Sequence, residues 1–253
     1  MNRSVLGIST MKESTMTKQH RISGKDLGAL ALPEACPRCF WIRRHATLGL
    51  PWQVFPGIFS SIDAYTKRAV HGWFDVHGSA PPWLAELGEL AGYINPPHHS
   101  KFCLLDPETN ILLTGAADGI LVRPDGSHVI VDYKTAKFTG NQDTLYPMYE
   151  TQLNCYALIA EGVGISPVTG LALVYAEPVT DIESSDCDAV QCETGFDLSF
   201  AARVLPVSLD TSRIQPLLRR ARAIIDLELP PPGKVGCPEC GKLDGLLNLL
   251  RSR

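Results

Sequence analysis

Two pairs of cysteines near opposite ends of the chain restrict how it can fold. Each pair has the spacing C-x-x-C, with Cys36 and Cys39 in "CPRC" and Cys237 and Cys240 in "CPEC". One such pair is weak evidence for a metal site, but four thiolates make a complete tetrahedral shell, and both Zn²⁺ and [4Fe–4S] clusters accept four cysteines. If the pairs share one site, the fold must return the C-terminal segment to the N-terminal one. The alternatives are two independent pairs or two incidental ones.

The stretch "HVIVDYKTAKF" (128–138) has the pattern of a buried strand that ends in an acid and a base. Residues 129–131 are β-branched and continuous, as in a strand covered on both faces. Residues i and i+2 of a strand point to the same face, so Asp132 and Lys134 share a face at its end. The pair is either a surface ion pair or half of an active site.

The composition is that of a soluble globular protein with no general attraction to polyanions. Hydrophobic residues make up 45% of the 253 residues, charged residues 20%, and the net charge is −4. Any binding to nucleic acid must therefore come from local basic clusters. No apolar run approaches the roughly 20 residues that cross a bilayer, and the first residues lack the apolar core of a signal peptide. We therefore expect free thiols, a cytoplasmic location and no membrane partner.

Hydrophobic periodicity predicts helices and strands in a recognisable order. The expected helices are 57–74, 146–162 and 211–229, with a possible short helix within 82–94. The expected strands are 111–123, 128–134, 168–178 and 200–209. The first two strands are joined by an Asp-Gly turn. The order α, β, β, α, β, β, α predicts an α/β fold with a mixed central sheet flanked by helices.

Asp118 interrupts the first expected strand and is expected to lie near Asp132 if the two strands pair across the turn. Two carboxylates at one point are suitable ligands for a hard cation such as Mg²⁺ or Mn²⁺. A lysine beside them can orient a water or stabilise charge on a phosphate. On the next helix, Gln152 and Tyr156 are four residues apart and share a face that can reach the strand end. Solvated charges at the end of a strand remain the alternative.

Together these residues resemble the PD-(D/E)XK nucleases of the RecB type. Asp118 in "GAADGIL" matches the motif aspartate, Asp132 and Lys134 in "VIVDYKT" match (D/E)-x-K, and Gln152 and Tyr156 in "QLNCY" match Q-x-x-x-Y. The resemblance covers about residues 57–177 and implies a restriction-endonuclease-like fold that hydrolyses DNA phosphodiesters. It also implies that the two aspartates bind Mg²⁺ or Mn²⁺, that the lysine assists the attacking water, and that the glutamine and tyrosine position substrate or lysine.

One position departs from the resemblance. Members of this group often carry a metal-binding histidine about one turn into the helix that here begins near Gly57, and this chain has serine in that place. Asp63 on the same helix is a candidate substitute ligand. An ion pair between Asp63 and Lys67, four residues later, is an equally good interpretation.

The four cysteines resemble those of the iron–sulfur CRISPR-associated exonucleases and of the AddB nuclease domain. In those proteins, cysteines before and after the nuclease core join its two ends around a [4Fe–4S] cluster. The resemblance favours such a cluster at Cys36, Cys39, Cys237 and Cys240. The usual arrangement is one cysteine before the core and three after it, whereas this chain has two and two, so Zn²⁺ is the alternative.

Basic residues stand beside both cysteine pairs and are candidates for phosphate contacts. They are Arg38, Arg43, Arg44, His45, Arg219, Arg220 and Arg222. If the pairs meet, these side chains are expected to form one basic patch. Phe40 and Trp41 are either base-stacking residues or, as we favour, part of the packing at a helix start.

These observations predict a disordered tail at 1–20 and one nuclease domain at 21–253. The predicted activity is metal-dependent DNA cleavage by an exonuclease or end-processing enzyme in phage replication, recombination, repair or defence. The expected partners are DNA, single-stranded or with free ends, and a helicase or recombination protein. The alternative is a catalytically silent DNA-binding module that retains the fold.

Overall fold

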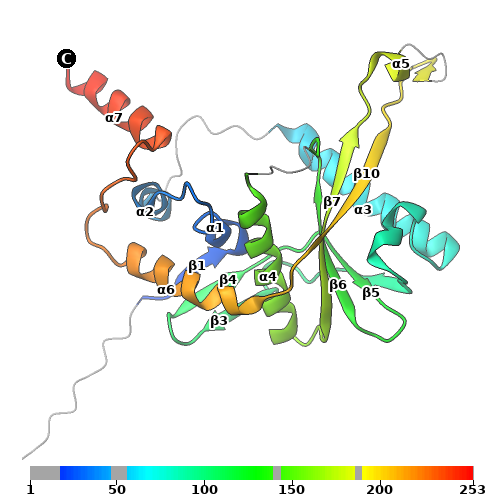
Figure 1. The fold of residues 1–253 in the computed structure, drawn as a ribbon, viewed down its shortest axis with the longest axis horizontal. Helices are drawn as coiled ribbons and strands as arrows, with labels where there is room; N and C mark the ends of the chain where they lie inside the picture. Colours follow the sequence, from blue (N-terminus) through cyan, green and yellow to red (C-terminus); the bar gives the residue numbers. More distant parts are fainter. Residues whose placement is uncertain (1–17, 47–55, 139–143, 186–189, 253) are drawn as a thin grey trace, which may run out of the picture.

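A computed structural model describes residues 18–46, 56–138, 144–185 and 190–252. Residues 1–17 of the expected tail lie outside the described residues, and His20 is the first residue of strand β1 (His20–Ser23). The body of the protein is a pair of sheets with helices packed between and around them (Figure 1). Among the described residues, no helix has both the length and the apolar character needed to span a bilayer.

The central sheet has five strands and is mixed, which confirms the predicted fold class. Its order is β10-β7-β6-β5-β2. The strands are β2 (Gly92–Ile94), β5 (Gly119–Val122), β6 (His128–Lys134), β7 (Val168–Pro178) and β10 (Phe200–Val207). Strands β6 and β7 are parallel, and the other neighbours are antiparallel.

A second sheet of three strands has the order β1-β4-β3. It contains β3 (Cys103–Asp106) and β4 (Ile111–Thr114) beside β1. The expected single strand 111–123 is therefore wrong, because the chain leaves one sheet after Thr114 and enters the other at Gly119. The crossing is made of small residues, and a Cβ on Gly115 would lie 2.7 Å from the ring of Tyr156. Close approach to this ring requires glycine at this crossing.

The helices include all three that periodicity predicts. They are α1 (Gly24–Gly28), α2 (Pro37–His45), α3 (Gly57–His77), α4 (Tyr146–Gly162), α5 (Ile182–Ser185), α6 (Ile214–Ile225) and α7 (Pro238–Arg251). The described residues also include the 3₁₀ helices η1 (Pro82–Leu87) and η3 (Thr211–Arg213). The third predicted helix is shorter than expected, since α6 ends at Ile225. Of the possible helix within 82–94, only the first half is helical, and its last residues form β2.

The central sheet separates two apolar clusters. On one face, α4 and α6 cover Ile130, Leu171 and Leu173. On the other face, α3 and η1 cover Val129 and Val131, which alternate with Ile130 along β6. Helix α4 connects β6 to its parallel neighbour β7, so the site-bearing strand and the site-bearing helix are consecutive in the chain.

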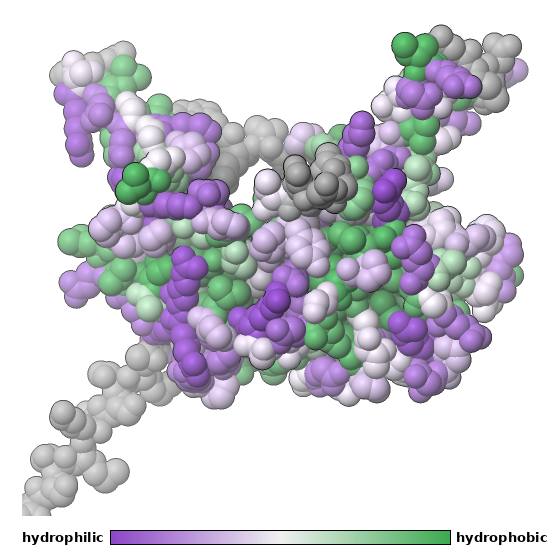
Figure 2. Space-filling model, in the orientation of Figure 1, coloured by the Kyte–Doolittle hydropathy of each residue, from purple (hydrophilic) through white to green (hydrophobic). Residues whose placement is uncertain are grey.

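Two parts of the chain project from this body in the same direction (Figure 1). One is the far end of β7 and β10, which carries α5 and the short strands β8 (Gln191–Cys192) and β9 (Gly195–Phe196). The other is the C-terminal helix α7. Figure 2 shows the two projections rising at the upper left and the upper right of the molecule. Because β6 and β7 are parallel, the C-terminal end of β6 lies at the sheet edge from which β7 extends.

Candidate active site and cysteine metal centre

Strand β6 presents its acid and its base to helix α4. Val131 and Tyr133 belong to the apolar cluster under α3, so the alternate residues Asp132 and Lys134 face the other side of the sheet. Lys134 forms an ion pair with Asp132 Oδ2. Its Nζ also lies 4.3 Å from the ring centre of Tyr149 on α4, a cation–π contact. The alternation of β6 thus places both groups at the sheet edge, beside α4.

Asp132 is an almost fully buried carboxylate, with only 3% of its surface exposed. Burial raises its pKa, the neighbouring Lys134 ammonium lowers it, and the carboxylate of Asp118 raises it again, to a value of about 6. A buried charge of this kind is costly unless cations balance it. A cation bound beside the Asp132 carboxylate would therefore offset the cost of burying this charge.

Asp118 lies just before β5, at the position opposite Asp132 in the antiparallel pairing of β5 with β6. The register pairs Gly119 with Val131. The backbone N–H of Tyr133 donates a 3.0 Å hydrogen bond to Asp118 Oδ2. The structure thus brings the two aspartates together across the hairpin, as counting back from its turn predicts.

Gln152 and Tyr156 on α4 complete a buried polar group around Asp132. The amide Nε2 of Gln152 donates to Asp132 Oδ1 at 3.0 Å and to the hydroxyl of Tyr156 at 2.8 Å. Gln152 Oε1 is buried and, within the described part of the chain, has no hydrogen-bond partner. A buried acceptor of this kind needs a donor, and a water or a ligand hydroxyl beside the aspartates would supply one.

Helix α3 contributes one further acid and one further base. Lys67 Nζ lies 2.8 Å from Asp63 Oδ2 and 2.7 Å from Asp118 Oδ1. The expected ion pair between Asp63 and Lys67 is therefore present, and it extends to a motif aspartate. Ser61, near the place where the resemblance expects histidine, is exposed and donates to the carbonyl of Gly57 at 3.4 Å.

Sequence reasoning missed the roles of Lys67 and Tyr149. Helical spacing indicates Lys67 only as the partner of Asp63. It carries no information about Asp118, which lies next to a strand far along the chain. Tyr149 lies on the α4 face that also carries Gln152, three residues away, and this spacing is the signal that would have found it.

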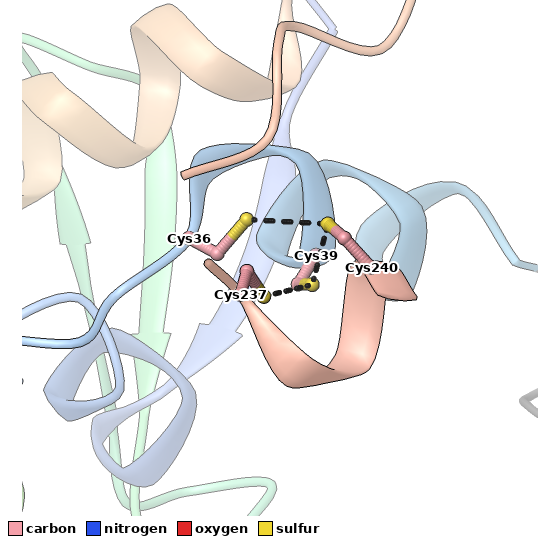
Figure 3. A group of neighbouring side chains, drawn as sticks. All are labelled: Cys36, Cys39, Cys237 and Cys240. Atoms are coloured by element: carbon pink, nitrogen blue, oxygen red, sulfur yellow. Dashed lines mark hydrogen bonds between the residues drawn. The ribbon is translucent and has the colours of Figure 1, made fainter. Parts of the chain in front are cut away.

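The four cysteines meet although almost the whole domain separates the two pairs. Figure 3 shows their side chains converging between α2 and α7. The Sγ–Sγ distances are 3.6 Å for Cys36–Cys240, for Cys39–Cys237 and for Cys39–Cys240. All four sulfurs lie within 4.8 Å of one another, a group that can hold a metal ion. The expected joining of the N- and C-terminal segments is therefore present.

Both pairs sit at helix starts, where the pKa of Cys36 falls but burial raises the pKa of Cys39 and of Cys240. Cys36 is the N-cap of α2 and Cys237 the N-cap of α7, and a proline follows each. The positive end of a helix dipole stabilises negative charge. Burial raises the pKa of Cys36, but hydrogen bonds from the backbone N–H of Cys39 and Lys234 and from neighbouring thiols lower it to about 6. The Cys36 sulfur is thus prepared to bind a metal.

The arginines near the cysteines are mostly engaged within the protein. Helices α2 and α6 pack together, so the two basic segments do meet. However, Arg38 pairs with Asp244, Arg44 with Asp26, Arg219 with Glu108 and Arg222 with Asp226. Arg220 donates to the carbonyl of Leu30. Paired arginines offer little free charge to a phosphate backbone, so the expected basic patch is much weaker than its residue count suggests.

The aromatic residues beside the first cysteine pair belong to the packing. Phe40 is buried in the main apolar cluster, with 6% of its surface exposed. Trp41 stacks on His45 with ring centres 3.8 Å apart, and its Nε1 donates to the carbonyl of Leu227 at 2.8 Å. The favoured interpretation of these residues as packing at a helix start agrees with these contacts.

The match to one protein-family model agrees with this geometry. The chain matches the model of the PD-(D/E)XK nuclease superfamily over residues 64–241, more than two thirds of its length. No curated protein matches it. Among solved structures, one described as "Crystal structure of SSO0001" is similar to it, with 15% identity and a TM-score of 0.42. That likeness covers 85% of this chain and 81% of the other. On the family match, the chain belongs to the PD-(D/E)XK nuclease superfamily.

Proposed function

We propose that the protein is a deoxyribonuclease in which Asp118 and Asp132 hold Mg²⁺ or Mn²⁺ and Lys134 assists hydrolysis. The observation that carries the proposal is the convergence of both aspartates, the lysine and Gln152 at one sheet edge. The chemistry of this donor set fits a hard divalent cation, because carboxylate oxygens are its preferred ligands. The buried, unpartnered Gln152 Oε1 supports a further ligand or water at the same place.

Each residue then has a separate task. The bound ion supplies positive charge to the scissile phosphate and makes a nearby water more acidic. Asp132 is held in one orientation by Gln152, and Asp118 by the backbone N–H of Tyr133. Lys134 carries its charge beside Asp132, where it can orient the attacking water or stabilise the phosphate oxygens. Tyr156 fixes the Gln152 amide by accepting its second hydrogen bond.

The finer assignment is a RecB-type enzyme that processes free DNA ends, acting in the cytoplasm beside a helicase or recombination protein. Support comes from the matching Q-x-x-x-Y pair on α4, in which Gln152 donates one hydrogen bond to Asp132 and another to Tyr156. A role in phage replication, recombination, repair or defence follows from the resemblance to such enzymes.

A cleavage assay on the full chain tests the activity. We expect Mg²⁺- or Mn²⁺-dependent cleavage of linear single- or double-stranded DNA that chelation stops, and resistance of circular DNA if free ends are required. Asp132→Asn and Lys134→Ala should abolish it. Lys137→Ala removes an exposed lysine three residues further on and should cleave like the wild type. A chain that binds DNA but cleaves no substrate would instead be the catalytically silent module.

For the cysteine site, we infer a single zinc ion in place of the [4Fe–4S] cluster that the resemblance favours. Tetrahedral zinc with Zn–S bonds of about 2.3 Å places its sulfurs about 3.8 Å apart. The observed Sγ–Sγ distances of 3.6 Å support this spacing. In a cluster, each cysteine binds a different iron at the corner of a cube, which requires sulfurs further apart. Elemental analysis of anaerobically purified protein should give about one zinc per chain and not about four irons.

A further inference from the structure

We propose that Lys67 is a built-in cation of the active site, which fills the place between Asp63 and Asp118 and limits the carboxylate site to one divalent ion. This inference rests on the proposed function and specifies its metal requirement. Asp63 is then the anchor of Lys67 and binds no metal in the native chain.

The position of the ammonium group is the first argument. Lys67 Nζ lies 2.7 Å from Asp118 Oδ1 and 2.8 Å from Asp63 Oδ2, so it bridges the two carboxylates. A divalent ion shared by these two acids would need the same space. The other oxygen of Asp118 accepts from the backbone N–H of Tyr133, which leaves Asp118 little freedom to turn away from Lys67.

The lysine is held there by the fold and not only by its charge. Its side chain is 29% exposed, and that of Asp118 is 19% exposed, so the pair is partly shielded from water. Carboxylate oxygens of both acids contact the ammonium group, so the local charge favours a cation at this position. Asp63 and Lys67 are one helical turn apart on α3, whose rigidity fixes the ammonium relative to the strands.

Charge balance is the second argument. The three aspartates at positions 63, 118 and 132 and the two lysines at positions 67 and 134 together carry one net negative charge. One divalent ion reverses this to one positive charge, which a single phosphodiester neutralises. A second divalent ion would leave excess positive charge in a partly buried site, which is costly.

Counting bound Mn²⁺ tests the inference without relying on cleavage. The full chain, with its cysteine site loaded, is titrated with Mn²⁺ and the free ion is measured by electron paramagnetic resonance. Mn²⁺ prefers oxygen ligands, so the four thiolates do not compete for it. We expect one Mn²⁺ per wild-type chain, lost in Asp132→Asn. Lys67→Met, whose side chain is one atom shorter and uncharged, vacates the position of the ammonium group and should bind two.

Three controls separate this effect from a general change in the helix. Arg68→Met removes a positive charge from the next, exposed position of α3 and should bind one Mn²⁺. Lys67→Arg keeps a cation and should also bind one. Combining Lys67→Met with Asp63→Asn removes the second set of ligands and should return the count to one. If Lys67→Met does not fold, Lys67→Gln provides a second uncharged variant.

The possible results distinguish this inference from the proposed function. Two Mn²⁺ ions on the wild type, or one on a folded and uncharged Lys67 variant, would overturn the role of Lys67 while leaving DNA cleavage untouched. A wild-type chain that binds no Mn²⁺ and cleaves no DNA would overturn both.

Discussion

The side-chain amide of Gln152 lies 3.0 Å from Asp132 Oδ1 and holds a buried carboxylate in a fixed orientation. Residues that orient a metal ligand typically change affinity or activity about 10- to 100-fold when they are replaced. We therefore expect Gln152→Ala to reduce turnover by that factor, and Tyr156→Phe, which keeps the ring but loses the acceptor, to reduce it less. Steady-state kcat on a labelled DNA substrate measures both. Loss of stability with unchanged specific activity would mean that the pair is only structural.

Asn154 provides a matched control on the same helix and a prediction of its own. It is fully buried and donates to the carbonyls of Glu150 and Ser208 at 2.9 Å, while its Oδ1 accepts from the N–H of Asp210 at 2.7 Å. Asn154→Ala leaves buried backbone groups unpaired, so the free energy of unfolding should fall by about 2–4 kcal/mol. Urea denaturation measures this loss.

Activity should be unaffected at this position. Two residues along a helix are about 200° apart, so Asn154 faces away from the side that carries Gln152. The folded Asn154→Ala enzyme should keep its wild-type kcat, and a lower kcat would show that this face of α4 also acts on the site.

The cysteine site should hold the two ends of the domain together. Cys240→Ser should lose the bound metal and lower Tm by about 10 °C or more, because a structural metal contributes directly to folding and each kcal/mol corresponds to about 2–4 °C. Limited proteolysis should then cut near α7 first. Cys192→Ser, at an exposed cysteine, should change neither metal content nor Tm. Full stability after loss of the metal would contradict a joining role.

Helix α1 packs so closely on α4 that Gly28 has no space for a side chain. A Cβ there would lie 2.5 Å from the carbonyl oxygen of Met148. Because backbone must move to relieve this contact, Gly28→Ala should lower the free energy of unfolding by about 1–3 kcal/mol. Gly72 lies in the exposed middle of α3, where a Cβ would meet no other part of the described chain within 4 Å beyond its own helix backbone, so Gly72→Ala should instead raise the free energy of unfolding by about 0.5–1 kcal/mol. Thermal melting of the two variants should shift in opposite directions.

Local patterns in the sequence determined much of this protein. Periodicity predicted α4 and β6 with their observed bounds. Helix α4 has a long apolar pattern that packs on the sheet, and β6 is a continuous apolar strand within the sheet. The i, i+2 rule placed Asp132 and Lys134 on one face, and hairpin counting placed Asp118 opposite. The spacing of four put Gln152 and Tyr156 together. All of these relations depend on the regular geometry of one helix or one hairpin, so the sequence alone specifies them.

Only the tertiary structure decided the relations between distant elements. The strand expected at 111–123 is divided between two sheets, at a crossing where Gly115 packs against Tyr156 of another element. The arginines near the cysteines are paired with acids from α1, α7 and the turn after β3, so their charge is largely used within the protein. Lys67 reaches Asp118 because α3 packs across the sheet. Such contacts follow from the packing of whole elements, which no local spacing specifies.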